Sequence, residues 1–165
     1  MKCYGGGRLP PMAEMTFGGR DTFHSFDTKK YPLLMSSPHS HYRVHSFLDN
    51  NFWLRGDCYR HAIWLSVADA KARGIKDDDP VRVYNDLGET VIPAYVTSRV
   101  VPGTAFIFHG SWYTPDKDKT ALMPEGLDRG GAPNFQIHNE DLPQTIIGMF
   151  PCKGLVQVEK WEGKK

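Results

Sequence analysis

The fold is decided by the stretch YPLLMSSPHSHYRVHSFLDNN, residues 31–51. Its apolar residues 33–35 predict a short strand that leads into a segment rich in basic side chains. Because side chains alternate between the two faces of an extended strand, one face would carry His39, His41, Arg43 and His45. Pro38 has no amide hydrogen, which places the segment at an edge or a bend, where backbone amides stay free. Free amides beside imidazoles and a guanidinium suit a phosphate group.

A metal site is a second interpretation of the same stretch. His-x-His followed by a further histidine is a ligand pattern of barrel metalloenzymes, and Cys58 and His61 follow closely in sequence. Arg43 would repel a cation at this position, and no acidic ligand has a suitable spacing. A stand-alone metal-dependent β-barrel enzyme that uses His39, His41 and His45 therefore stays as an alternative, as does plain packing or solvation of these side chains.

Composition limits the classes of function. The chain has 165 residues, of which 40% are hydrophobic and 24% charged, as expected for one globular domain. A net charge of +1 gives no reason to expect nucleic acid as a partner. The apolar runs are too short for a membrane span, so we expect no direct membrane contact. Three separate cysteines, Cys3, Cys58 and Cys152, form no disulfide or metal pattern and favour a reducing compartment.

The remaining patterns predict short strands and one helix. Ser66 and Asp69 form a capping box for a helix that ends at Gly74. Residues 81–84 and 89–96 flank an Asn-Asp-Leu-Gly turn and predict a hairpin, with Pro93 at an edge or bulge. Further strands are expected at 105–108 and 154–160, and core at 52–54 and 62–65. Together they indicate a small barrel.

The segment GSWYTPDKDKTALMPEGLDRGGAPN, residues 110–134, has no regular period. Connections of this length within a compact domain are more often functional than idle. Gly130 and Gly131 permit a close backbone approach. The Asn134 amide can donate and accept hydrogen bonds, as the edge of a base or a pterin requires.

Five segments, taken in their order along the chain, resemble the C-terminal cofactor-binding domain of the dimethyl sulfoxide reductase family of molybdopterin oxidoreductases. The segments are YPLLMSSPHSHYRVHS, VADAKARGIKDDDPVRVYNDLGE, VVPGTAFIFHGSWYTPD, DRGGAPN and KGLVQVEK. The resemblance covers roughly residues 31–161 and implies a mainly β domain, a six-stranded double-psi β-barrel with one or two short helices. Residues 1–30 would be an arm or linker from a preceding domain, and residues 162–165 a charged tail.

The resemblance also implies the ligand, a bis(molybdopterin guanine dinucleotide) cofactor with molybdenum or tungsten, shared with preceding domains. Carried over position by position, the cofactor-binding residues are Ser36, Ser37, Pro38, His39, Ser40, His41, Arg43, His45, Trp112, Asn134 and Lys153. In the family, the metal ligand, any iron–sulfur cysteines and the substrate pocket lie mostly in preceding domains. We therefore expect no catalytic residue and no metal ligand in this chain.

The expected function is cofactor binding within the catalytic subunit of a larger oxidoreductase of the kind used in anaerobic respiration, with the isolated chain inactive. Expected partners are the preceding domains of the same polypeptide and an iron–sulfur electron-transfer subunit. The compartment stays open, because an export signal would precede residue 1. An interaction domain that docks a partner through Trp53 and Trp112 is the remaining alternative.

Overall fold

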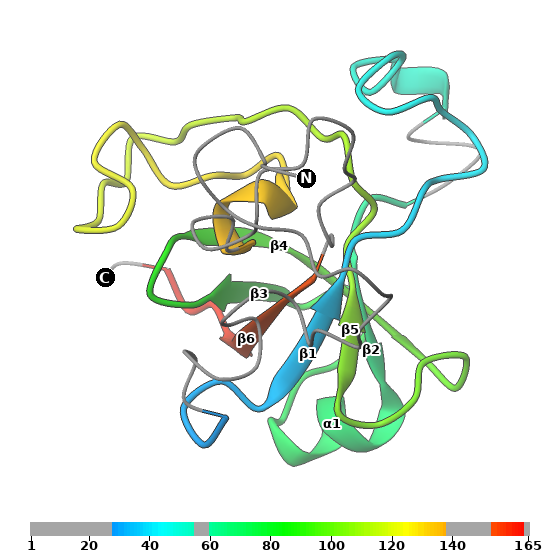
Figure 1. The fold of residues 1–165 in the computed structure, drawn as a ribbon, viewed down its shortest axis with the longest axis vertical. Coiled ribbons are helices and arrows are strands. Elements are labelled where there is room, and N and C mark those ends of the chain that lie inside the picture. The colour runs from blue at the N-terminus through cyan, green and yellow to red at the C-terminus, as the bar shows by residue number, and fades with distance from the viewer. Residues whose placement is uncertain (1–27, 55–59, 138–152, 164–165) are drawn as a thin grey trace, which may run out of the picture.

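The computed structural model of the chain describes residues 28–54, 60–137 and 153–163 (Figure 1). Residues 1–27 of the arm expected at residues 1–30 lie outside this part, as do all three cysteines. The described residues form a closed six-stranded barrel. Its named helices are a short α-helix, α1 (Val67–Ala72), and a 3₁₀ helix, η3 (Pro133–Gln136). The strands are β1 (Leu33–Ser36), β2 (Ile63–Ser66), β3 (Pro80–Tyr84), β4 (Glu89–Thr97), β5 (Thr104–Phe106) and β6 (Lys153–Lys160).

The strand order around the barrel is β1-β5-β2-β4-β3-β6, and the sheet closes between β6 and β1. The pairs β1/β5 and β2/β4 are parallel, whereas the other four pairs are antiparallel. Neighbours in the barrel are thus mostly distant in sequence. The expected double-psi β-barrel with short helices is confirmed. Closure leaves the barrel without the free edges that invite aggregation.

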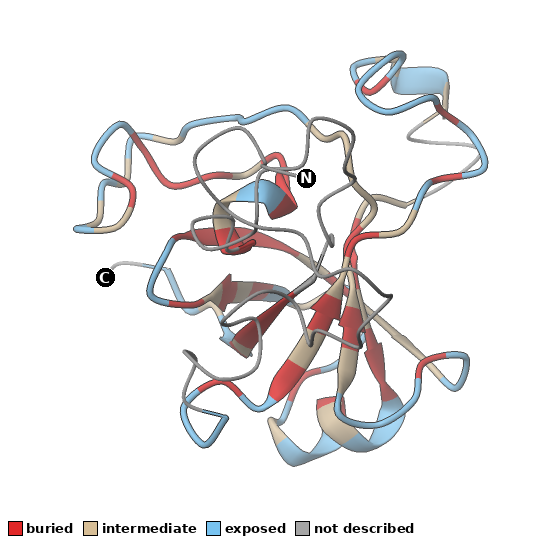
Figure 2. Cartoon of the chain, in the orientation of Figure 1, coloured by how far each residue is buried: buried red, intermediate tan, exposed pale blue. Residues whose placement is uncertain are grey.

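The core follows the two-residue period of the strands. Leu33 and Met35 of β1 point inward, and the same alternation recurs in β3 (Figure 2). In β6, Val156 and Val158 belong to the main core, and Leu155 is buried in a second cluster with Tyr31.

The expected hairpin is confirmed, with β3 antiparallel to β4. Pro93 lies where β4 changes partner, since β3 pairs with it up to Pro93 and β2 pairs with it from Ala94 onward. A residue that lacks an amide hydrogen is tolerated at such a change.

Helix α1 is capped as the sequence indicates. The Ser66 hydroxyl accepts a hydrogen bond from the Asp69 amide at 3.0 Å, and Gly74 ends the segment with a φ of +64°. No helix among the described residues is both long enough and apolar enough to cross a membrane.

Two expectations about residues 37–54 are wrong. Strand β1 stops at Ser36, and the chain continues in turns in which His45 and Leu48 have positive φ angles of 50° and 67°, so the basic side chains do not alternate along a strand. Residues 52–54 are not core either, because the Phe52 and Trp53 side chains are exposed. In Figure 1 this part of the chain, coloured cyan, projects away from the barrel.

Candidate functional site

Three histidines from two distant segments meet at one end of the barrel. His109 Nε2 lies 3.0 Å from His45 Nδ1, and the His39 and His109 rings are 4.0 Å apart. Nitrogen atoms of all three imidazoles lie within 4.8 Å of one another. We call His39, His45 and His109 the histidine triad. Because its ring nitrogens converge, the triad can donate hydrogen bonds to an anion or share a transition metal ion.

The parallel pairing of β1 with β5 brings the triad together. Both strands run toward the same end of the barrel, and beyond them the His109 amide still donates to the Pro38 carbonyl at 3.2 Å. Sequence reasoning missed His109, which follows an apolar strand without any local motif. Only the parallel pairing of β1 with β5 reveals that His109 lies beside the loop after β1.

His109 has an electrostatic environment that favours the neutral imidazole. Burial lowers its pKa below the ordinary value of 6.5, and the charges of His39, His45 and Arg43 act in the same direction. A hydrogen-bond contact between its Nδ1 and the Ser37 carbonyl, at 3.4 Å, partly opposes this shift. The lowered pKa favours the neutral imidazole, which can both donate and accept a hydrogen bond.

Arg43 holds the histidine-bearing loop from inside. Its side chain is fully buried and forms an ion pair with the Asp49 carboxylate. Its Nη2 donates to the His109 carbonyl at 2.9 Å and to Ser111 Oγ at 3.1 Å. Asp49 in turn accepts the Trp112 amide at 3.0 Å. The expectation that Arg43 shares a face with three histidines is wrong, because the guanidinium points inward while His39, His41 and His45 are exposed.

Contacts continue from Arg43 to the loop that contains Gly130 and Gly131, which we call the late glycine loop. His61 Nε2 lies 2.8 Å from Ser111 Oγ and 3.1 Å from the Gly131 carbonyl oxygen. Gly130 passes so close to Trp112 that an added Cβ would lie 1.9 Å from the Trp112 carbonyl oxygen. The predicted close approach at the glycine pair is confirmed. The loop that leads to Asn134 is thus tied to the segment that carries His109.

Asp128 organises the late glycine loop. It begins the segment DRGGAPN, but no role was predicted for it from the sequence. Its buried carboxylate accepts the amides of Thr114, Gly130 and Ala132 at 2.8–3.0 Å. It also accepts the Thr90 hydroxyl of β4 at 2.8 Å. The loop is therefore fixed to the barrel, and Asn134 follows it in η3.

Comparison with known proteins gives the family. Residues 33–149 match the model of the family described as Molydopterin dinucleotide binding domain. The chain belongs to this family.

Its relatives are much longer chains. The domain is 36% identical over 142 residues to dimethyl sulfoxide reductase DmsA of Escherichia coli (strain K12), which covers 86% of this chain and 16% of the relative. It is 34% identical over 152 residues to the pyrogallol hydroxytransferase large subunit of Pelobacter acidigallici, covering 86% of this chain and 17% of the relative.

A solved structure shares the fold. Acetylene hydratase from Pelobacter acetylenicus superposes with a TM-score of 0.55 at 18% identity, covering 81% of this chain and 19% of that chain. The family match favours a molybdopterin-binding domain over a stand-alone metal enzyme or an interaction domain.

The predicted site residues of this molybdopterin-binding domain lie in different parts of the structure and differ in burial. Ser36 ends β1 and pairs with Lys153, the first residue of β6, whose side chain lies outside the described part. Ser40 is buried, and its hydroxyl accepts the Tyr42 amide at 3.2 Å. His41 is not in the triad, so the ligand set of the metal hypothesis is not the set that the fold brings together.

His41 instead lines a depression of about 450 Å³ on the outer side of β2 and β4. Its other lining residues are Tyr42, Arg60, Trp64, Tyr95, Arg99 and Phe108.

Trp112 and Asn134 lie on the surface. The Trp112 indole donates to the Ser46 carbonyl at 3.1 Å, and this bond joins it to the histidine-bearing loop. Asn134 is exposed in the first turn of η3. Its amide is therefore accessible to a ligand.

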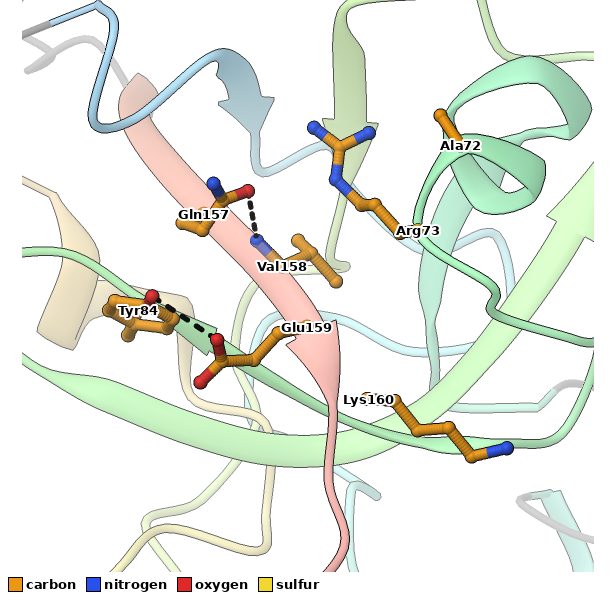
Figure 3. A pocket seen from close by; sticks show the side chains of 7 residues that line it. All are labelled: Ala72, Arg73, Tyr84, Gln157, Val158, Glu159 and Lys160. Carbon is orange, nitrogen blue, oxygen red and sulfur yellow. Dashed lines mark hydrogen bonds between the residues drawn. The ribbon is translucent and has the colours of Figure 1, made fainter.

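A second depression, of about 480 Å³, lies away from these residues (Figure 3). It contains none of the predicted site residues. The Tyr84 hydroxyl donates a hydrogen bond to the Glu159 carboxylate at 3.4 Å. In the figure, Lys160 points away from the other side chains. The lining residues are Ala72, Arg73, Tyr84, Gln157, Val158, Glu159 and Lys160.

The residues at the end of β1 fit a ligand rich in hydrogen-bond acceptors. Ser37 Oγ is buried and has no hydrogen-bond partner among the described residues. Buried polar groups are normally satisfied, so this hydroxyl, which has no partner among the described residues, is available to bond a further group. Together with exposed imidazole donors, it matches a pterin or a pyrophosphate group.

Proposed function

We propose that this chain is the C-terminal cofactor-binding domain of a molybdenum or tungsten oxidoreductase subunit. It would bind a pterin dinucleotide of a bis(molybdopterin guanine dinucleotide) cofactor, and the isolated chain would be inactive. The observation that carries the proposal is the triad beside the orphaned Ser37 hydroxyl, in a chain of this family. When bound, the cofactor metal would supply the electron-transfer chemistry.

The cofactor contacts come from the loop after β1 and from the late glycine loop. Ser36 to His41 and His45 offer hydroxyls, imidazoles and backbone amides, and His109 joins them as a third imidazole. Trp112, Asn134 and Lys153 complete the set. Arg43 belongs to the site as a positioning residue, since its bonds to Asp49 and the His109 carbonyl fix the loop.

The remaining machinery would lie in the rest of the subunit. The chain spans 16–17% of the curated relatives named above, which leaves most of such a protein outside the matched region. The preceding domains would supply the metal ligand and the substrate pocket, and an iron–sulfur subunit would exchange electrons with the cofactor.

The test compares cofactor content in variants of the full-length subunit. His39→Ala combined with His45→Ala should lower pterin and metal content at least several-fold, because two exposed donors of the triad are lost. Lys71→Ala, an exposed change on α1, serves as the control and should retain full content. Circular dichroism establishes that each variant is folded. Wild-type pterin content in the folded double variant would contradict the assignment.

A further inference from the structure

Asn85 lies in the turn between β3 and β4, and its side-chain amide is fully buried. The Oδ1 atom accepts the amides of Leu87 and Gly88, at 2.9 and 3.3 Å. The Nδ2 group donates to the carbonyls of Gln136 and Leu155, at 2.8 and 3.1 Å. Because an amide offers two hydrogens and an oxygen with two lone pairs, this side chain uses its whole hydrogen-bonding capacity. Three segments that are distant in sequence meet on it.

The bonds of Asn85 join two elements that carry predicted cofactor contacts. One is η3, in which Asn134 is exposed, and the other is β6, which begins at Lys153. Lys153 in turn pairs with Ser36 at the end of β1. The late part of the proposed cofactor site is therefore connected to the loop after β1 through this one buried amide.

Backbone contacts hold η3 between the β3–β4 turn and β6. An added Cβ on Gly88 would lie 2.8 Å from the Phe135 carbonyl oxygen, and one on Gly154 would lie 2.3 Å from the Gln136 carbonyl oxygen. A 3₁₀ helix of four residues has weak internal hydrogen bonding. Strand β6, in contrast, is held by ladders to β1 and β3. Of the two elements that Asn85 joins, η3 is thus the one whose place depends on it.

We propose that Asn85 is a positioning residue of the cofactor site, which sets the place of Asn134 relative to the loop after β1. The inference rests on the proposed function. A binding group must be held within about 0.5 Å of its productive place by the residues behind it. Since its side chain is fully buried, Asn85 would act through η3 and not by touching the ligand.

The test measures the pterin that remains bound per folded full-length subunit after gel filtration. Asn85→Asp keeps the oxygen that accepts the turn amides but replaces the Nδ2 donor with an oxygen that faces two carbonyls. Retained pterin should fall several-fold, because η3 is displaced. Gly88→Ala pushes on η3 at Phe135 without removing a hydrogen bond, and it should lower retained pterin in the same way.

Ser66→Ala is the control for lost stability. It removes the N-cap of α1, whose hydroxyl accepts the Asp69 amide at 3.0 Å. In Figure 1, α1 lies at the lower end of the barrel, away from the orange helix η3. This variant should therefore be less stable and still retain as much pterin as the wild type. An equal loss of pterin from Ser66→Ala and Asn85→Asp would overturn the proposal.

A double variant separates positioning from a general effect on the fold. If Asn85 acts by placing Asn134, then Asn85→Asp combined with Asn134→Ala should retain as much pterin as Asn134→Ala alone. Losses that add up in the double variant would overturn the proposal, as would wild-type retention in folded Asn85→Asp and Gly88→Ala subunits.

The combined His39→Ala and His45→Ala variant, measured alongside, tests the proposed function separately. Loss of pterin from that variant, with full retention in the Asn85→Asp subunit, would overturn the role of Asn85 alone. Full retention in Asn134→Ala would overturn it as well, because Asn85 would then have no cofactor contact to position.

Discussion

The Arg43 guanidinium is buried against the Asp49 carboxylate, six residues further along the chain. This pair closes the loop that carries His39 and His45. Arg43 also donates a hydrogen bond to the His109 carbonyl, and Asp49 accepts one from the Trp112 amide. One ion pair thus fixes the loop after β1 to the segment after β5. The geometry of the histidine triad depends on it.

Arg43→Ala should lower the free energy of unfolding by about 3–5 kcal/mol, because it leaves the Asp49 carboxylate buried without its partner. Urea denaturation measures this. Arg60→Ala, which removes partly exposed pairs with Asp77 and Asp78, is the matched control and should cost about 1 kcal/mol or less. Equal losses from the two variants would contradict the role assigned to Arg43.

Gly110→Ala should be more destabilising than Gly103→Ala. The two glycines have nearly the same φ, 86° and 84°, so both changes carry a similar backbone penalty of about 1–2 kcal/mol. Only at Gly110 would the new Cβ collide with the His45 backbone. Denaturation curves of both variants isolate the cost of the collision, and a loss at Gly110 no larger than at Gly103 would show that the loop does not pack there.

His109 should make the domain less stable in acid. Its folded pKa lies below 6.5, so as the pH falls through 6.5 the unfolded state takes up a proton that the folded state does not. Stability is unaffected by this group above that pH and decreases below it. His109→Gln should flatten the dependence between about pH 7.5 and pH 5.5. An NMR titration of His109 with a midpoint above 6.5 would contradict the burial argument.

Metal removal should leave the fold intact. The described strands close the barrel through backbone ladders and an apolar core, and the triad lies in turns beyond them. The thermal midpoint of the purified chain should therefore be the same with and without a chelator. A fall of several degrees that is absent in His109→Ala would instead assign the triad to a structural metal ion.

Local patterns in the sequence predicted the helix and most of the strands, but residues 62–65 were expected only as core and form β2 (Ile63–Ser66). Alternating apolar residues placed β3 and β6, and the Ser66–Asp69 capping box placed α1. These features depend on residues close together in sequence. The same patterns indicated a small barrel, but its six-stranded double-psi topology was expected only through the family resemblance.

The site was harder to predict because its contacts are non-local. Alternation of basic residues does not distinguish a strand from a series of turns, so Arg43 was expected on the outside. Its carbonyl acceptor at His109 is 66 residues away. Phe52 and Trp53 were expected in the core because large apolar residues are usually buried. The sequence alone does not show which apolar residues stay exposed.

The most direct test is a structure of the cofactor-loaded full-length subunit. We expect a pterin dinucleotide at a hydrogen-bonding distance of about 2.7–3.2 Å from the loop Ser36 to His45 and from Asn134. A cofactor bound entirely away from this loop, without contact to Ser37 or to the histidine triad, would contradict this prediction.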